Sequence, residues 1–200
     1  MKNAFAATVL TVSLLAPTSG ACGDYAVRPG KECRVIFTSK AAMEKFEGKT
    51  DRLEGNISVD PAALGDSATF HFEVDVASLD TGIKMRNQHM RENHLETTKF
   101  PKAIFDGGSL HAASGVRLGA GKPESLQVEG TFTLHGVSRR IRIAVEVTVR
   151  LDPAPGRINF STEFPVALAD YAISRPQFLF LKLAEVQTVR VSGTAHAVSR

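Results

Sequence analysis

The stretch LQVEGTFTLHGVSRRIRIAVEVTV, residues 126–149, decides the fold of this chain. Apolar and polar residues alternate on both sides of His135-Gly136, and a period of two residues is typical of strands with one buried face. Two such segments joined by a short turn predict an antiparallel hairpin. The side chains expected to share its inner face are Leu126, Val128, Phe132 and Leu134 before the turn and Ile141, Ile143, Val145, Val147 and Val149 after it.

The same alternation extends along the chain in both directions from this hairpin. Glycine, proline and aspartate cluster between the alternating segments and indicate turns. Together with the two hairpin strands, the segments make about eight strands, which predicts an all-β protein. The further segments are 69–76, 158–168 and 189–192, with weaker candidates at 34–38, 53–59 and 102–110.

Two stretches interrupt the strand pattern. Residues 82–98 lack the period of two, and they predict a short helix around residues 83–95 that ends before Pro101. Residues 170–182 are irregular and contain the apolar run Phe178-Leu179-Phe180-Leu181. This run either plugs one end of the folded structure or closes its core.

Eight antiparallel strands leave no exposed edge if the sheet closes into a barrel. The polar faces of these strands carry Glu, Arg, Asp and His, so they must meet water and the apolar faces must point inward. This arrangement is the reverse of an outer-membrane barrel. An eight-stranded barrel is either filled by side chains or holds one small ligand. Gly55, Gly130 and Gly193 lie at inward-phased positions, where they either leave interior space or mark bulges and bends.

Composition limits the classes of function. The chain has 200 residues, 43% of them hydrophobic and 22% charged, which suits one globular domain. The net charge of +3 and the lack of a basic stripe with interleaved aromatic residues argue against nucleic-acid binding. The twelve Phe, two Tyr and no Trp indicate an interior filled by rings that mostly lack a polar group.

The start of the chain has the features of a secretory signal peptide. Lys2 precedes an apolar stretch at 4–16, and Ser19-Gly20-Ala21 offers the small residues of a cleavage site. The apolar stretch is shorter than the ~20 residues that a spanning helix needs, so we expect no membrane span. The sequence therefore predicts a signal peptide at 1–21 and a single barrel domain at 22–200, located in the periplasm or secreted.

Cys22 and Cys33 are the two cysteines of the chain. An oxidising compartment favours a disulfide between them. Two alternatives stay open. Cys22 could be the lipidated first residue of a lipoprotein, although Ser19 occupies the position where a large aliphatic residue is required, or both cysteines could be free thiols.

Five motifs are spread along the chain: VASLDTG at 76–82, RNQHM at 86–90, FPKAIF at 100–105, GTFTLHGVSR at 130–139 and FPVALADYAI at 164–173. They resemble the motifs of the YceI family and occur in the family's order over nearly all of residues 24–197. Each motif alone is a weak signal, but the ordered set is specific.

The resemblance implies a lipocalin-like, extended eight-stranded antiparallel β-barrel that is exported to the periplasm or secreted. It also implies an elongated hydrophobic channel that holds a polyisoprenoid amphiphile, such as a quinone or a polyprenyl chain. Three features depart from the family pattern: the two early cysteines, Ala172 in place of a common glycine, and the apolar run at 178–181. These departures bear on the ligand more than on the fold.

We therefore expect an exported lipid-binding protein that serves transport, storage or stress response. Its ligand would be an isoprenoid-like lipid, with no other cofactor, no metal and no enzymatic activity. Each CH2 group moved from water into the interior would contribute ~0.8 kcal/mol. The sequence leaves the oligomeric state open. The residues expected to line the ligand site are Phe70, Phe72, Val74, Phe105, Phe132, Leu134, Val145, Phe160, Phe164, Val166, Leu168 and Phe178.

Polar residues around the expected helix have two predicted roles. Arg86, Asn87 and His89 are candidates for holding the polar head of the ligand at the barrel mouth. Asp80 and Thr81 are expected to cap the helix, because their side chains accept hydrogen bonds from the unpaired N–H groups at a helix start.

Two other functions are kept as alternatives. One is a lipid-processing enzyme that uses His89 together with Asp80. The other is a ligand-free secreted protein-interaction module, whose marks would be a solid core and an exposed apolar patch. No HExxH or CxxC motif is present, so the sequence predicts no metal site.

Overall fold

A computed structural model describes residues 23–40, 45–59, 68–111, 122–150, 156–178 and 181–198. The expected signal peptide, residues 1–21, lies outside this range, as does Cys22. The strands of the main sheet are β1 (Gly23–Val27), β2 (Arg34–Lys40), β3 (Lys45–Thr50), β4 (Leu53–Val59), β5 (Thr69–Asp75), β6 (Lys102–His111), β7 (Pro123–Leu134), β8 (Val137–Arg150), β9 (Arg157–Ala167) and β12 (Val186–Ala197).

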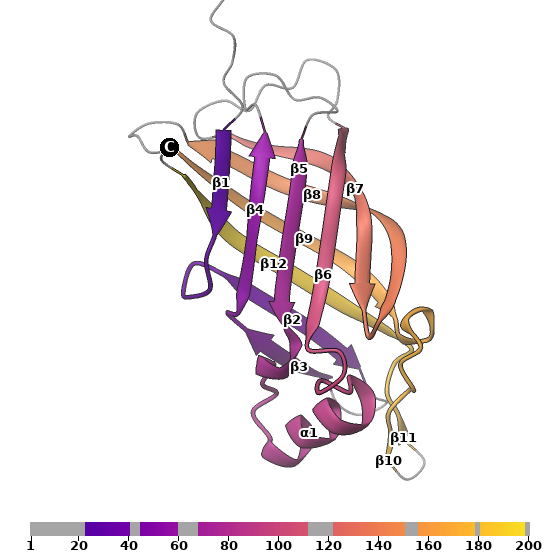
Figure 1. Ribbon diagram of the computed structural model, residues 1–200. Helices are drawn as coiled ribbons and strands as arrows, with labels where there is room; N and C mark the ends of the chain where they lie inside the picture. Colours follow the sequence, from indigo (N-terminus) through magenta and orange to yellow (C-terminus); the bar gives the residue numbers. More distant parts are fainter. Residues whose placement is uncertain are drawn as a thin grey trace, which may run out of the picture.

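The sheet is antiparallel and closes into a barrel. Its spatial order is β1-β4-β5-β6-β7-β8-β9-β12-β2-β3, and β1 also pairs with β12 (Figure 1). The ring therefore contains the eight strands from β1 to β12 in that order, which confirms the predicted eight-stranded barrel. Strands β2 and β3 continue from the lower part of β12, outside the ring.

The composition of the ring differs from the prediction at one strand. Segment 34–38 was expected to be a barrel strand, but it forms β2, which shares one edge of β12 with β1. β1 pairs with the end of β12 at residues 195–197, and β2 pairs with residues 188–192. β1 has only five residues, too few to show a clear period of two. Sequence alternation therefore missed the strand that closes the barrel.

The hairpin that decides the fold has a tight turn. Leu134 pairs with Val137, so His135 and Gly136 form a two-residue loop. Both have positive φ, at 51° and 75°, as a type I′ hairpin turn requires. β8 starts at Val137 rather than at residue 141, because the consecutive arginines at 139–140 hide the alternation there.

The predicted short helix is confirmed at the lower end of the barrel in Figure 1. It consists of α1 (Lys84–His89), which continues into the π-helical turn η2 (Met90–His94). The expected capping is wrong. Ile83 is the N-cap residue and makes no side-chain capping bond, while the Asp80 carboxylate accepts from the Gly82 N–H at 2.8 Å.

The remaining elements are short. The 3-10 turns η1 (Val76–Ser78) and η3 (Leu168–Tyr171) follow β5 and β9. β10 (Gln177–Phe178) and β11 (Leu181–Lys182) form a separate two-stranded sheet that does not join the barrel sheet. Residues 179–180 of the apolar run, and the side chains of Phe178 and Leu181, lie outside the described part of the chain. Whether this run plugs or closes the barrel therefore stays a prediction.

Buried apolar side chains form two clusters along the barrel. Half-buried rings of Phe105 and Phe164 pack against both of them. The upper core cluster consists of Tyr25, Val27, Cys33, Val35, Leu53, Ile57, Val59, Ala68, Leu110, Leu126, Val128, Ile143, Val147, Val149, Ile158 and Ala195. The lower core cluster, next to the helix, consists of Val76, Leu79, Ala103, Phe132, Val166, Leu168, Tyr171 and Ile173.

Cys33 is buried in the upper core cluster, and it forms no disulfide with another described residue. Its Sγ donates to the Arg28 carbonyl at 3.2 Å, and burial raises the pKa of the thiol. Since Cys22 lies outside the described residues, the disulfide between Cys22 and Cys33 stays a prediction.

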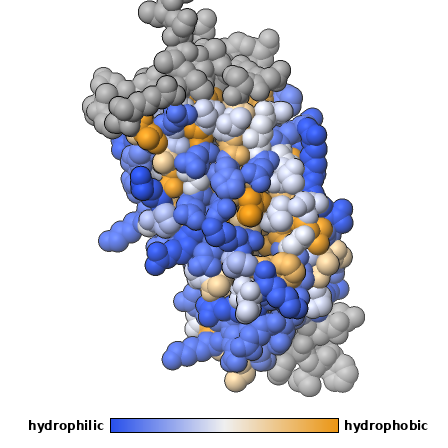
Figure 2. All heavy atoms as spheres, in the orientation of Figure 1, coloured by the Kyte–Doolittle hydropathy of each residue, from blue (hydrophilic) through white to orange (hydrophobic). Residues whose placement is uncertain are grey.

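The outer wall is polar, as the alternation predicts. Figure 2 shows hydrophilic side chains over most of the visible face, with scattered apolar ones among them.

On the outer face of β5 and β6, His71 contacts two carboxylates. Its Nδ1 lies 2.6 Å from Asp106 Oδ1, and its Nε2 lies 3.2 Å from Glu73 Oε1. The hydrogen bond to Asp106 is the main cause that raises the pKa of His71, and Glu73 contributes in the same direction.

We expect the Asp106→Asn variant to lower the pKa of His71, measured by NMR titration of the ring. A raised pKa in the folded state stabilises the fold at acidic pH, and this stabilisation is lost as pH rises through the folded-state pKa. The effect on stability is small because the His71 side chain is 43% exposed. Glu73→Gln, which removes the weaker partner, is the matched control and should lower the pKa less. An unchanged His71 pKa in Asp106→Asn would contradict this assignment.

Candidate ligand-binding cavity

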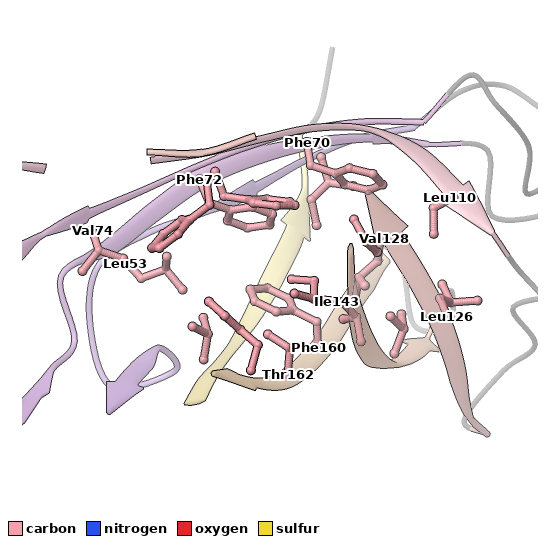
Figure 3. A pocket seen from close by; sticks show the side chains of 18 of the residues that line it. Leu53, Phe70, Phe72, Val74, Leu110, Leu126, Val128, Ile143, Phe160 and Thr162 are labelled. Carbon is pink, nitrogen blue, oxygen red and sulfur yellow. The ribbon is translucent and has the colours of Figure 1, made fainter. Parts of the chain in front are cut away.

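The inward faces of the barrel strands enclose an apolar cavity of about 130 Å³. Figure 3 shows Phe70, Phe72 and Phe160 projecting into it. Thr162 supplies the one hydroxyl among the lining side chains, and it already donates to the Ala144 carbonyl at 2.6 Å. The lining residues are Leu53, Ile57, Val59, Phe70, Phe72, Val74, Ala103, Phe105, Leu110, Leu126, Val128, Phe132, Ile143, Val145, Val147, Ile158, Phe160, Thr162, Phe164 and Val191.

Most of the residues predicted to line a ligand site lie on this cavity. Leu134, Val166 and Leu168 do not, since they lie in the lower core cluster or pack against it. The backbone of Phe178 lies in β10, outside the barrel sheet. The predicted residues on the cavity wall are Phe70, Phe72, Val74, Phe105, Phe132, Val145, Phe160 and Phe164.

Sequence reasoning missed several smaller lining residues. Leu126, Val128, Ile143 and Val147 were recognised as inward-facing but not as part of a site. Their phase along the strands was available as a signal, but the prediction took only some of the aliphatic residues that share it. Leu53 at the start of β4 is 1% exposed and is also on the wall.

Gly55 and Gly193 each lie against a phenylalanine ring of the neighbouring strand. Gly55 pairs with Phe72, and Gly193 pairs with Phe160, in continuous register without a bulge. A Cβ atom at position 193 would lie 2.7 Å from the Phe160 ring. One at position 55 would lie 2.5 Å from the Phe72 ring and 2.4 Å from the His71 carbonyl oxygen. Each ring therefore occupies the space that a side chain at the paired glycine would take. The Phe72 and Phe160 rings extend inward from opposite sides of the barrel and contact each other, with their centroids 5.3 Å apart.

The third glycine of the prediction lies beside a bulge. Gly130 pairs with Gly107, and the register of β6 shifts between Gly107 and Ser109. A Cβ atom at position 130 would lie 2.5 Å from the Asp106 carbonyl oxygen, so a side chain there would push on the backbone. The predicted roles of the inward glycines were interior space or a bulge or bend. A bulge accompanies Gly130, whereas at Gly55 and Gly193 a phenylalanine ring occupies the space that the missing side chain leaves.

Aromatic contacts fill the barrel below the cavity. Phe132 lies on the cavity wall and in the lower core cluster, with its ring edge-on to Phe164 at 5.7 Å and to Tyr171 at 5.4 Å. Met90 and Leu95, from the helical segment and the residue that follows it, pack against the same cluster. The helical segment therefore covers the lower end of the apolar interior.

The three candidates for a polar head site have different positions. Asn87 is buried, and its Oδ1 accepts from the Thr81 N–H at 2.8 Å while its Nδ2 donates to Asp80 at 2.6 Å. Arg86 Nε donates to Thr81 Oγ1 at 3.0 Å, and its guanidinium lies 4.2 Å above the Phe46 ring. His89 is exposed at the end of α1. Asn87 and Arg86 thus hold the turn before the helix, and contact of the three with a ligand stays a prediction.

The arrangement gives little support to the enzyme alternative. Hydrogen bonds from the Gly82 N–H and the Asn87 amide, and the charge of Arg91, lower the pKa of Asp80. A carboxylate held in this way is a weak base. Within the described part of the chain, no hydrogen bond joins His89 to Asp80, and no group of three His, Cys, Asp or Glu residues is placed to hold a metal ion.

No helix in the described ranges is long and apolar enough to cross a membrane.

Comparison with known sequences identifies relatives along nearly the whole chain. The family model described as YceI-like domain matches residues 25–195. A UPF0312 protein of Vibrio campbellii is 30% identical over 178 residues, covering 86% of this chain and 89% of the relative. A UPF0312 protein of Shewanella putrefaciens is also 30% identical, covering 86% of this chain and 88% of the relative.

Solved structures share the fold. A polyisoprenoid binding domain from Saccharophagus degradans, implicated in plant cell wall breakdown, superimposes with a TM-score of 0.68 at 20% identity, covering 89% of this chain and all of that one. BcnA of Burkholderia cenocepacia gives a TM-score of 0.65 at 20% identity, covering 81% of this chain and 95% of that one. The eight-stranded barrel with its short helix is therefore a fold that known proteins also adopt.

Proposed function

Because this chain belongs to the YceI-like domain family, we propose that it binds an isoprenoid-like amphiphile, such as a quinone or a polyprenyl chain, inside its barrel. The observation that carries this proposal is the cavity of Figure 3, whose walls are apolar apart from one hydroxyl engaged with the backbone. The relative from Saccharophagus degradans, described as polyisoprenoid binding, supports the ligand class from a protein of the same fold.

The chemistry of the wall determines which part of a ligand enters. Each CH2 group that leaves water contributes ~0.8 kcal/mol. A polar head group buried without a partner would lose about 1–3 kcal/mol instead. Since the lining side chains offer no unengaged hydrogen-bonding group, the hydrocarbon part of the ligand lies inside and the head group stays outside.

The cavity volume limits the size of ligand that fits without movement of side chains. At about 130 Å³, the cavity is comparable to an engineered apolar cavity of ~150 Å³ that binds benzene. It is smaller than the ~300–1,000 Å³ of most ligand pockets. A chain longer than a ring-sized group therefore needs side chains to move apart. Phe72 and Phe160 face each other across the interior and are the first that must move.

The proposal includes export, with the lipid bound for transport, storage or stress response. Its support is the signal-like sequence at residues 1–21 and the pair Cys22 and Cys33. Protein expressed in an exporting bacterial host should have lost residues 1–21. The same intact mass shows whether the two cysteines are two hydrogens short, as a disulfide requires.

Val145→Phe is expected to abolish lipid binding without unfolding the barrel. Val145 is half-buried on the cavity wall, so the added ring fills space that the ligand would occupy. Native mass spectrometry of the exported wild type, followed by organic extraction, should reveal a stoichiometric prenyl or quinone species. The variant should be bare, with a midpoint of thermal unfolding close to that of the ligand-free wild type.

Val186→Phe is the matched control, because Val186 is 49% exposed and does not line the cavity. It should retain the wild-type ligand load. A wild type that stays bare after incubation with quinones and polyprenols would contradict the proposal. That result would favour a filled barrel and the protein-interaction alternative.

A further inference from the structure

Two large apolar side chains are exposed at the start of α1. Ile83 is 50% exposed and Met85 is 69% exposed, and Lys84 lies between them. Val186 and Val198 are the other exposed large hydrophobic residues in the described part of the chain, and they lie elsewhere in the sequence. Figure 1 places α1 at the end of the molecule opposite the C-terminus. The barrel therefore presents a small apolar tip at this end.

The tip is held firmly by the packing behind it. Asn87, one turn after Ile83, is buried and bonded to Asp80 and Thr81. Arg91 donates to the Leu79 carbonyl at 3.2 Å on the side of the helix that faces the barrel. Although these contacts fix the segment on the barrel, Ile83 and Met85 stay largely exposed to solvent.

Basic residues outnumber acidic ones around the apolar tip. From Asp80 to Glu92 the sequence contains Lys84, Arg86 and Arg91 against the two acidic residues at its ends. The neighbouring strand β3 is joined to this segment by the bridge between Lys49 and Asp80, in which each backbone N–H donates to the other residue's carbonyl at 2.9 Å. The charged residues of β3, Lys45, Glu47 and Lys49, therefore belong to the same end of the molecule, and Lys49 forms an ion pair with Glu47 at 3.1 Å.

The hairpin of β2 and β3 adds an unfavourable pair of like charges. Lys40 and Lys45 are directly opposite each other in the two strands, and both are exposed. Like charges directly opposite each other destabilise a sheet, and a bound anion would relieve their repulsion. Figure 2 shows the lower end of the molecule as mostly hydrophilic, with few apolar atoms among the polar ones.

We propose that this end of the barrel docks on the surface of an anionic phospholipid bilayer. Segments that bind at a membrane surface combine exposed apolar residues with Lys and Arg. The apolar side chains enter the boundary between head groups and acyl chains, and the cations contact the anionic head groups. Ile83 and Met85 insert, and Lys40, Lys45 and Lys84 contact lipid phosphates. A soluble anion would satisfy the lysines but would give no reason for the two exposed apolar side chains that flank Lys84.

The docking surface lies at the end of the apolar interior that the helical segment covers. Met90 and Leu95 pack on the lower core cluster on one side of this segment, while Met85 faces outward on the other. Docking places the covered end of the barrel against the bilayer. The inference does not depend on what the cavity binds.

The test is co-sedimentation of the purified protein with vesicles of phosphatidylcholine mixed with phosphatidylglycerol. The wild type should pellet with these vesicles at low salt, less at high salt, and weakly with pure phosphatidylcholine. The variant I83S/M85S should bind at least about tenfold more weakly, a loss of about 1.4 kcal/mol. Lys84→Glu should weaken binding to the mixed vesicles and leave the weak binding to pure phosphatidylcholine unchanged.

The matched control is Val198→Ser, which removes a 50% exposed apolar side chain beside the start of β1, where the Val198 N–H donates to the Asp24 carbonyl, and this variant should bind like the wild type. Substitutions of exposed residues are expected to leave thermal unfolding nearly unchanged, which checks the fold of each variant. Val145→Phe should still pellet, because it changes the cavity and not the tip. Wild type that stays in the supernatant at low salt, or I83S/M85S that pellets like the wild type, would overturn the proposal.

Discussion

Phe132→Ala is expected to reduce the free energy of unfolding by about 3–5 kcal/mol, the usual cost of deleting a buried phenylalanine ring. Phe132 is 9% exposed and lies where the cavity meets the lower core cluster. Its removal takes away edge-on contacts with Phe164 and Tyr171 and leaves a hole between two packed regions. Urea unfolding followed by circular dichroism measures the loss.

Phe132→Ala lowers stability, but it should strengthen the binding of long hydrocarbon ligands. Without the Phe132 ring, the cavity extends toward the lower core cluster and accepts a longer hydrocarbon chain. A ligand that binds only the folded state restores stability by mass action, so added polyprenol should raise the midpoint of the variant more than that of the wild type.

Phe46→Ala serves as the control for Phe132→Ala. The Phe46 ring contacts Phe37 and the Arg86 guanidinium, and it does not line the cavity. Its loss should cost less stability and leave the effect of polyprenol unchanged. A loss below about 1 kcal/mol in Phe132→Ala would contradict the view that this ring joins the two packed regions.

Gly193→Ala is expected to lower the free energy of unfolding by about 1–3 kcal/mol, the range found for overpacked cores. The new Cβ would lie 2.7 Å from Cζ and 3.2 Å from Cε1 of Phe160. The three nearest atoms all belong to this ring, so the ring must turn away from the wall and into the cavity. Affinity for a prenyl ligand should therefore fall together with stability.

A double-mutant cycle identifies the ring as the cause. In the Phe160→Ala background, Gly193→Ala should cost little, so the two changes should be non-additive by about 0.5–3 kcal/mol. Gly108→Ala is the matched control, because a Cβ there would meet no atom within 4 Å. Additive losses from Gly193→Ala and Phe160→Ala would show that the ring does not depend on this glycine.

The strands that could be predicted are those with one buried and one exposed face, because apolar and polar residues alternate along them. β7 and β8 are long, polar outside and apolar inside, so their alternation is clear. β3, with the sequence KFEGKT, was not predicted. It lies outside the ring, pairs with β2 along one edge and has a single bridge to Asp80 on the other. A strand in this position has no fully buried face to impose a period of two.

The sequence predicts which side chains point into the barrel, but not which of them line the hollow part. An inward side chain on a hollow part of the barrel has the same position in the pattern as one in a filled part, so Phe164 and Val166 could not be distinguished. The structure separates them through Tyr171 and the helical segment, which fill the lower end. The role of Asn87 could not be predicted either, because its partners Asp80 and Thr81 depend on the path of the turn.

The pairing of β1 with β12 also determines the order in which the protein can fold. Ala26 is opposite His196, so the ring stays open until the last strand described here has reached the first. Hairpins such as β7–β8 can form from local contacts, whereas this seam requires closure of a loop that contains every other strand. All-β domains rich in such distant contacts fold in milliseconds to seconds. We therefore expect closure of the seam to be the slow final step, and the apolar interior to stay open to solvent, and to chaperones, until that step is complete.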